Sequence, residues 1–138
     1  MKTIITTVFI LFSFISFSQM SNLEKAVFEE FRIYKKKYNG NIVQLDTTLS
    51  FNCKEHSNTM YKVFKLFHAK MDGVNFKSEI CQESFVTSKI TKENAKFILD
   101  GFLVSSDHAK LLREKSNYMG IGITVDEYDK YWVTIRFR

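Results

Sequence analysis

The chain has 138 residues, of which 25% are charged and 45% hydrophobic, and a formal net charge of +5. Once a short N-terminal leader is subtracted, the remaining length suffices for one compact domain with its own core but not for two. The basic residues are scattered, and their one cluster, Lys35-Lys36-Lys37, fits a solvated helix end. A nucleic-acid-binding protein is therefore not expected.

The first eighteen residues are typical of a secretory signal peptide. Met1 and Lys2 precede the apolar run IITTVFILFSFISF, and small polar residues follow it. Its short length and its Ser and Thr residues disfavour a membrane-spanning helix, although a retained N-terminal anchor stays open. We expect residues 1–18 to be the signal peptide, residues 19–138 to form the mature domain, and the protein to be secreted or periplasmic.

Two helices are predicted in the first half of the mature domain. Residues 21–24 form a capping-box sequence, and apolar residues then recur at helical spacing until Asn39-Gly40 ends the run. After the extended piece IVQLD, a second apolar stripe predicts a helix that continues to about Phe67. His56 lies on this stripe, which favours a hydrogen-bonded, partly buried histidine over a ligand.

The pattern changes from helix to strand and back in the next forty residues. From Val74 the apolar period becomes two, which places Glu79 and Cys81 on the same face of a strand. Thr91 can then cap a third helix with a renewed helical period. The sequence Ser-Ser-Asp at 105–107 ends that helix and caps a short helical turn.

The last part of the chain predicts a β-hairpin. Apolar residues alternate over 121–125 and again over 131–137, with a polar turn between them. Gly120 and Gly122 alternate with the apolar set, which indicates that something packs closely over them. Helices before and between strands that end in a hairpin predict an α+β fold, an α-β-α sandwich with a small antiparallel sheet.

The two cysteines, Cys53 and Cys81, leave two interpretations open. In an oxidising compartment they can form one disulfide, which requires the second helix to pack over the Cys81 face of the strand. They can equally be small buried residues that never meet.

Five segments of the chain, in this order, form a recognisable pattern. They are FRIYKKKYNGNIVQLDTTLSFNCKEHSNTM, LFHAKMDG, SEIC, ILDGFLVSSDHAKLL and GIGITVDEYDKYWVTIRF. Together they resemble the CAP superfamily of cysteine-rich secretory proteins, antigen 5 and pathogenesis-related 1 proteins, in particular its short bacterial SCP-like members. In that family the corresponding segments are the opening helices, the segments with two cavity histidines and a cavity glutamate, and the closing strands.

The resemblance implies a set of cleft residues. His68 and His108 match the two cavity histidines, and Glu79 matches the cavity glutamate, with Glu83 as the fallback if the alignment shifts by one helical turn. Ser105 falls where eukaryotic members often have a second glutamate. We therefore expect the family site to be incomplete in this chain.

Three functions follow from these residues. The first, which the resemblance implies, is a secreted binding module for an extracellular small molecule, lipid or protein. In this module His68 and His108 can bind zinc or another divalent cation. The second is a hydrolase, either metal-dependent or with Ser105 or Ser106 as nucleophile, a histidine as base and Glu79 as its orienting group. No Gly-x-Ser-x-Gly elbow supports it. The third is a lipid or membrane-surface binder.

Overall fold

The computed structural model describes residues 20–69 and 76–138. Its helices are α1 (Asn22–Asn39), α2 (Thr47–Val63), α3 (Thr91–Val104) and α4 (Ser106–Arg113), and its strands are β1 (Gln44–Leu45), β2 (Ser78–Phe85), β3 (Tyr118–Val125) and β4 (Lys130–Phe137). The expected signal peptide at 1–18 and Val74, the expected start of the first strand, lie outside the described residues. Within these ranges, no helix combines the length and apolar character needed to cross a bilayer.

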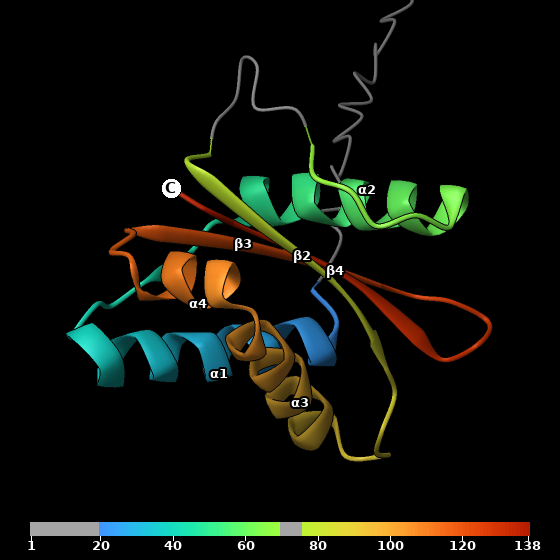
Figure 1. The fold of residues 1–138 in the computed structure, drawn as a ribbon, viewed down its shortest axis with the longest axis horizontal. Coiled ribbons are helices and arrows are strands. Elements are labelled where there is room, and N and C mark those ends of the chain that lie inside the picture. Colours follow the sequence, from blue (N-terminus) through green and yellow to red (C-terminus); the bar gives the residue numbers. More distant parts are fainter. Residues whose placement is uncertain (1–19, 70–75) are drawn as a thin grey trace, which may run out of the picture.

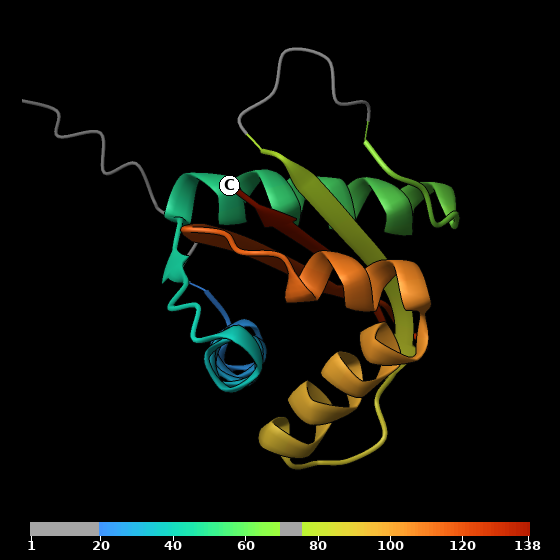
Figure 2. The same ribbon diagram turned by 60° about the vertical axis from the view of Figure 1, so that its left-hand side comes forward.

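The described elements form three layers. Helix α2 covers one face of the sheet, while α1, α3 and α4 lie on the other face (Figure 1; Figure 2). The strand order is β1-β3-β4-β2, in which β4 is antiparallel to both β3 and β2. The expected α+β fold, an α-β-α sandwich, is confirmed. The sheet is mixed rather than purely antiparallel, because the two-residue β1 runs parallel to β3 just before the chain enters α2.

Local signals define both ends of α1 as expected. Ser21 Oγ accepts the Glu24 N–H at 3.1 Å, and the Glu24 carboxylate accepts the Ser21 N–H at 2.8 Å. These two bonds complete the capping box and satisfy two main-chain donors. Gly40 has φ +70°, so it closes the helix in the left-handed conformation that glycine adopts without strain.

Lys35 differs from the expected solvated helix end, because it is fully buried. Its ammonium group donates to the main-chain carbonyls of Leu112 at 2.9 Å and Glu114 at 2.7 Å, at the C-terminal end of α4. Burial lowers the pKa of Lys35 to about 8, although the negative charge of Glu114 acts to raise it. Lys35 therefore ties α1 to α4, the helix that carries His108.

The close approach expected at the two strand glycines is present between β3 and α2. A Cβ atom on Gly122 would lie 2.1 Å from the main-chain nitrogen of Lys54, and one on Gly120 would lie 2.5 Å from the carbonyl carbon of Leu49. The backbone of α2 thus rests directly on β3. This contact leaves no space for a side chain at Gly122.

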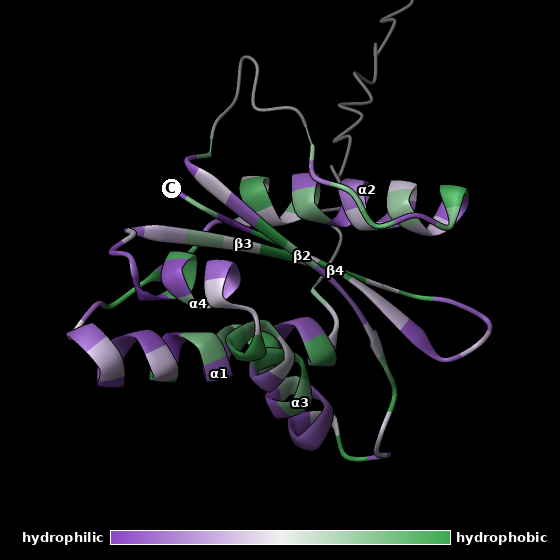
Figure 3. Ribbon diagram, viewed as in Figure 1, coloured by the Kyte–Doolittle hydropathy of each residue, from purple (hydrophilic) through white to green (hydrophobic). Residues whose placement is uncertain are grey.

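The main hydrophobic core lies between the sheet and the α1 and α3 helices. Figure 3 shows the hydrophobic C-terminal end of α3 beside the sheet, while its hydrophilic N-terminal end is turned away. Buried members of this core include Val27, Phe31, Ile80, Ile98, Phe102, Leu112, Ile121 and Ile135. A smaller cluster of Met60, Cys81 and Trp132 lies on the α2 side. The face toward α1 and α3 is therefore apolar, whereas the face toward α2 combines a small apolar cluster with buried polar residues.

Helix α2 ends one turn earlier than the apolar stripe predicts. Its last residue is Val63, and Phe64 takes a left-handed conformation with φ 49°, where its N–H caps the carbonyls of Met60 and Tyr61. The apolar pattern in the sequence extends to Phe67 because the segment after Phe64 also packs against α2. That segment brings His68 back to the sheet.

Helix α3 also starts differently from the expectation. Thr91 is its first helical residue, and Ile90 takes the N-cap position without a side-chain bond. The entry loop is held instead by Asn94, whose side-chain oxygen accepts the N–H groups of Thr87 and Ser88. This tertiary cap has no local sequence signature.

Two glycine substitutions should differ in their effect on the stability of the fold. Gly122→Ala should reduce the free energy of unfolding by about 1–3 kcal/mol, because two backbones must separate. Gly101→Ala is the control. Its Cβ meets only the flexible Gln82 side chain, and alanine improves helix propensity, so stability should be unchanged or rise by up to about 1 kcal/mol. Urea unfolding measures both, and equal losses would contradict the packing described here.

Candidate functional site

Glu79 on β2 is the centre of a buried polar network. Its side chain is 3% exposed, and its Oε2 accepts a hydrogen bond from Arg136 Nε at 2.7 Å across the β2–β4 pair. Its Oε1 accepts the Ala69 N–H at 2.9 Å. Burial alone would raise the pKa of Glu79, but Arg136, the Ala69 N–H and His56 together hold it below its usual value. Glu79 is therefore a carboxylate at neutral pH.

His68 lies against this carboxylate, as the resemblance implies. Its Nδ1 is 3.1 Å from Glu79 Oε1, while 58% of its side chain is exposed to solvent. A carboxylate accepts a hydrogen bond from Nδ1–H, so this contact favours the tautomer with the lone pair on Nε2. The exposed nitrogen of His68 is thus left as a ligand for a cation or a proton.

His56 approaches Glu79 from α2. Its Nε2 is 2.9 Å from the carbonyl oxygen of Phe67 and 3.8 Å from Glu79 Oε1, and its ring packs edge-on against Phe67. The histidine is buried and hydrogen-bonded, as its place on the apolar stripe indicates. Its nearness to Glu79 was not predicted, because it depends on how α2 packs over β2.

The candidate disulfide between Cys53 and Cys81 is not formed, and both residues are buried free thiols. The main chain of Cys53 rests over Gly122 on β3, whereas Cys81 on β2 pairs with Thr134 on the intervening β4. Two strand spacings amount to about 9–10 Å. A disulfide tolerates a Cα separation of at most about 7 Å, so α2 packs over the wrong strand for this bridge.

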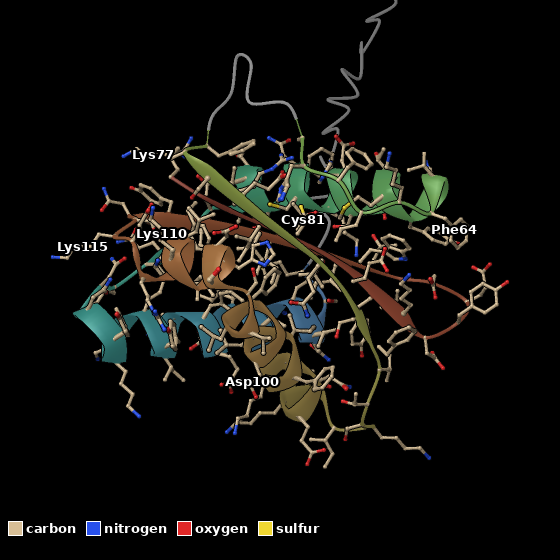
Figure 4. All side chains as sticks on the ribbon, in the orientation of Figure 1. Phe64, Lys77, Cys81, Asp100, Lys110 and Lys115 are labelled. Carbon is tan, nitrogen blue, oxygen red and sulfur yellow. The ribbon has the colours of Figure 1, made fainter. Side chains whose placement is uncertain are left out.

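His56, Glu79 and Cys81 form a buried group of potential metal ligands, with donor atoms within 4.8 Å of one another. Figure 4 shows Cys81 on β2 beneath α2. The donors are already occupied, however: His56 Nε2 bonds the Phe67 carbonyl, and Glu79 Oε1 accepts the Cys81 thiol at 3.4 Å. Burial and the charge of Glu79 raise the pKa of Cys81 far above its usual range. An ion at this position would have to displace these bonds.

His108 lies on α4 at an open cleft of about 590 Å³ beside β2. Its ring meets Phe102 edge-on at 5.3 Å, and its main-chain N–H points to Ser105 Oγ at 3.5 Å. Burial, and then the nearby charge of His68, lower the pKa of His108. His108 therefore favours its neutral form. The cleft is lined by Leu66, Cys81, Gln82, Glu83, Ser84, Phe85, Phe97, Gly101, Ser105 and His108.

Glu83, Ser105 and Ser106 are not placed as an orienting acid and a nucleophile beside a histidine base. Glu83 lines the cleft but pairs with Lys130 at 2.6 Å, and Glu79 is the glutamate that meets His68. Ser105 caps α4, and Ser106 is exposed as its first residue. Among residues 20–69 and 76–138, no hydrogen bond joins either hydroxyl to an imidazole nitrogen. The nucleophile–base contact of a serine hydrolase is not formed.

Arg136 is the main site residue that the sequence analysis missed. It lies in the buried strand KYWVTIRF, where its side chain is 8% exposed and pairs with Glu79. A charged residue within an otherwise apolar, alternating strand is rarely buried without a partner. That signal predicts a buried acid opposite Arg136, which here is Glu79.

The sequence of this chain matches a known protein family. Residues 26–137 match the family model described as CAP, the cysteine-rich secretory protein family. No curated protein sequence matches the chain significantly.

Solved structures with the same fold come from bacteria and a parasite. An outer surface protein of Borrelia burgdorferi has a TM-score of 0.64 and 16% identity, over 84% of this chain and 92% of that chain. An extracellular protein containing an SCP domain from Bacillus anthracis has a TM-score of 0.62 and 19% identity, over 84% of this chain but 40% of that chain. Schistosoma mansoni venom allergen-like protein 4 has a TM-score of 0.55 and 10% identity, over 86% of this chain and 89% of that chain. At these identities the likeness shows the fold alone.

The buried ion pair predicts a pH-dependent loss of stability on Glu79→Gln. This change leaves Arg136 buried without a counter-charge and should cost about 3 kcal/mol at pH 7. Since the folded pKa of Glu79 lies below its usual 4.5, its contribution is present above that value and disappears as pH falls through the folded pKa. Urea unfolding of both proteins at pH 7 and below pH 4 measures the difference.

Glu83→Gln is the matched control for this measurement. Glu83 lies on the same strand and also forms an ion pair, but its side chain is 33% exposed. Its substitution should cost at most about 1 kcal/mol. Equal losses for the two variants, or a Glu79→Gln loss that does not shrink in acid, would refute the role given to the buried pair.

Proposed function

Because the chain belongs to the cysteine-rich secretory protein (CAP) family, we propose that it acts outside the cytoplasm as a binding module with a cation-binding cleft. His68 and His108 are the ligands of a divalent cation, and Glu79 positions His68. Zinc is the favoured ion, since neutral imidazole nitrogens suit it and its remaining positions can take a ligand or water.

The observation that carries this proposal is the contact between His68 Nδ1 and Glu79 Oε1 at 3.1 Å. Histidines that bind metals usually donate their other ring N–H to a carboxylate or carbonyl, which orients the ring. Glu79 does this for His68 and is itself fixed by Arg136. His68 is thereby preorganised in a way that an exposed histidine in a loop otherwise is not.

His108 is the second ligand in this proposal. Its lowered pKa keeps the imidazole neutral at physiological pH, which is the form that binds metal. The buried group of His56, Glu79 and Cys81 fits an ion less well, because its donors are engaged in hydrogen bonds.

Export is the second element of the proposed function. The sequence of residues 1–18 has the order of a signal peptide, and the Borrelia and Bacillus proteins with this fold are described as outer surface and extracellular. We place the mature protein in the periplasm or outside the cell.

The export proposal predicts a new N-terminus. Mass spectrometry of the exported protein should find cleavage between Phe17 and Met20, where the apolar run ends in small and polar residues. An intact Met1 on soluble cytoplasmic protein would count against export.

The cation-binding proposal predicts that zinc and protons compete. Isothermal titration of zinc into the mature protein should give binding near pH 7 that weakens near pH 5, because the imidazoles become protonated. His68→Ala and His108→Ala should each weaken binding by about tenfold or more, and Glu79→Gln should weaken it by about tenfold through misorientation of His68.

Cys81→Ala distinguishes a site formed by His68 and His108 from the buried group. This change should leave zinc affinity unaltered if His68 and His108 hold the ion, and should abolish binding if the ion lies among His56, Glu79 and Cys81. Binding that is unaffected by His68→Ala and His108→Ala, or no binding at pH 7, would overturn the proposed cation site.

A further inference from the structure

Strand β2 lies at the edge of the sheet, with β4 on one side only. The N–H of Val86 donates to the carbonyl of Asp129 at 2.9 Å, in register with the β2–β4 ladder. Because main-chain groups alternate along an antiparallel strand, the even-numbered residues of β2 bond to β4. The N–H and C=O groups of Cys81, Glu83 and Phe85 therefore point away from the sheet.

Neither proline nor lysine within β2 blocks strand pairing at the outward edge. Within the part of the chain that the structure describes, no hydrogen bond reaches the outward main-chain groups of Cys81, Glu83 or Phe85. Edge strands are commonly protected by proline, lysine or short length. The chain has no proline, and the eight residues SEICQESF contain no lysine. Their two acids are paired, Glu79 with Arg136 and Glu83 with Lys130.

The open cleft follows this edge. Five consecutive strand residues, 81–85, line it, so the cleft contacts both faces of β2 and its free side. Leu66 forms one wall and the α3 residue Phe97 the other, and both are exposed apolar side chains. Phe85 is 62% exposed at the same edge. The cleft is therefore an elongated groove with apolar walls.

Two residues that line the groove each have a buried side-chain atom without a hydrogen-bond partner. These atoms are Gln82 Oε1 and Ser84 Oγ, and Ser84 is only 4% exposed. Unpaired buried polar atoms are costly, and in native proteins they commonly mark a position where a ligand or water supplies the bond. Both belong to residues that line the groove. Hydrogen-bonding capacity beneath the surface of the groove is therefore unused.

We propose that the free edge of β2 binds an extended acidic peptide segment of a partner protein, which adds to the sheet as a fifth strand. Outward main-chain groups that repeat every second residue, about 6.6–7 Å apart, match the spacing of another extended polypeptide. The positive net charge of the chain and the ion pair that neutralises Glu83 favour acidic side chains on that peptide. The inference rests on the proposed role as a binding module but requires no bound metal.

A displayed library of random 12-residue peptides, selected on the mature protein, tests the proposal. Selected peptides should alternate β-branched or aromatic residues with others and should carry acidic side chains. Synthetic copies that are N-methylated at every second amide should lose affinity by at least about tenfold in one register and little in the other, because only alternate amides bond to β2.

Two variants at one position supply the protein side of the test. Glu83→Pro removes an outward N–H that the sheet does not use, so peptide affinity should fall by at least about tenfold. Glu83→Ala, the matched control, keeps that N–H and frees Lys130, so its affinity for the peptide should not fall. Circular dichroism checks the fold of both variants. If the proline variant is unfolded, the comparison of the two N-methylated registers tests the proposal in its place.

Several results would overturn this assignment. They are failure to select any peptide, equal affinity of both N-methylated registers, and peptide binding that a folded Glu83→Pro variant retains. Concentration-dependent dimers that Glu83→Pro abolishes, without peptide binding, would assign the edge to a second copy of the chain instead. Zinc titration is independent of these outcomes, so failure of the cation site and failure of the peptide site are distinguishable.

Discussion

The buried ion pair between Glu79 and Arg136 is the interaction on which the candidate site depends. Two charges inside a sheet are tolerated only when each is fully bonded, so this pair constrains what surrounds it. Arg136 occupies one oxygen of Glu79, and the other is left for the loop that carries Ala69 and His68. A structural requirement of the sheet thus places an exposed imidazole beside an ionised carboxylate.

Local signals allowed much of the fold to be predicted from the sequence. The capping box at Ser21, the left-handed Gly40 and the close approach over Gly122 depend on neighbouring residues or on one clear packing demand. Features that depend on tertiary contacts were missed. The burial of Lys35 requires carbonyls from the distant α4, and the early end of α2 depends on the conformation of Phe64.

The same distinction between local signals and tertiary contacts applies to the candidate site. The family resemblance indicated His68, Glu79 and His108 as cleft residues, and the lining of the open cleft includes His108. It could not reveal that His68 is the histidine that meets Glu79, that Arg136 holds the glutamate or that His56 adjoins it. The disulfide failed for a geometric reason, since α2 rests on β3 while Cys81 lies on β2. The unpaired edge of β2 follows from strand order, which alternation alone does not determine.

The central claim is that an ionised Glu79 holds His68 in one tautomer with its other nitrogen free. Long-range proton–nitrogen NMR of protein with ¹⁵N-labelled histidine measures this directly. At pH 7.5 the His68 proton should lie on Nδ1, and Glu79→Gln should shift the balance toward Nε2–H, since the carboxylate acceptor is lost. A wild-type His68 that carries its proton mainly on Nε2, or a tautomer ratio that Glu79→Gln leaves unchanged, would contradict the account.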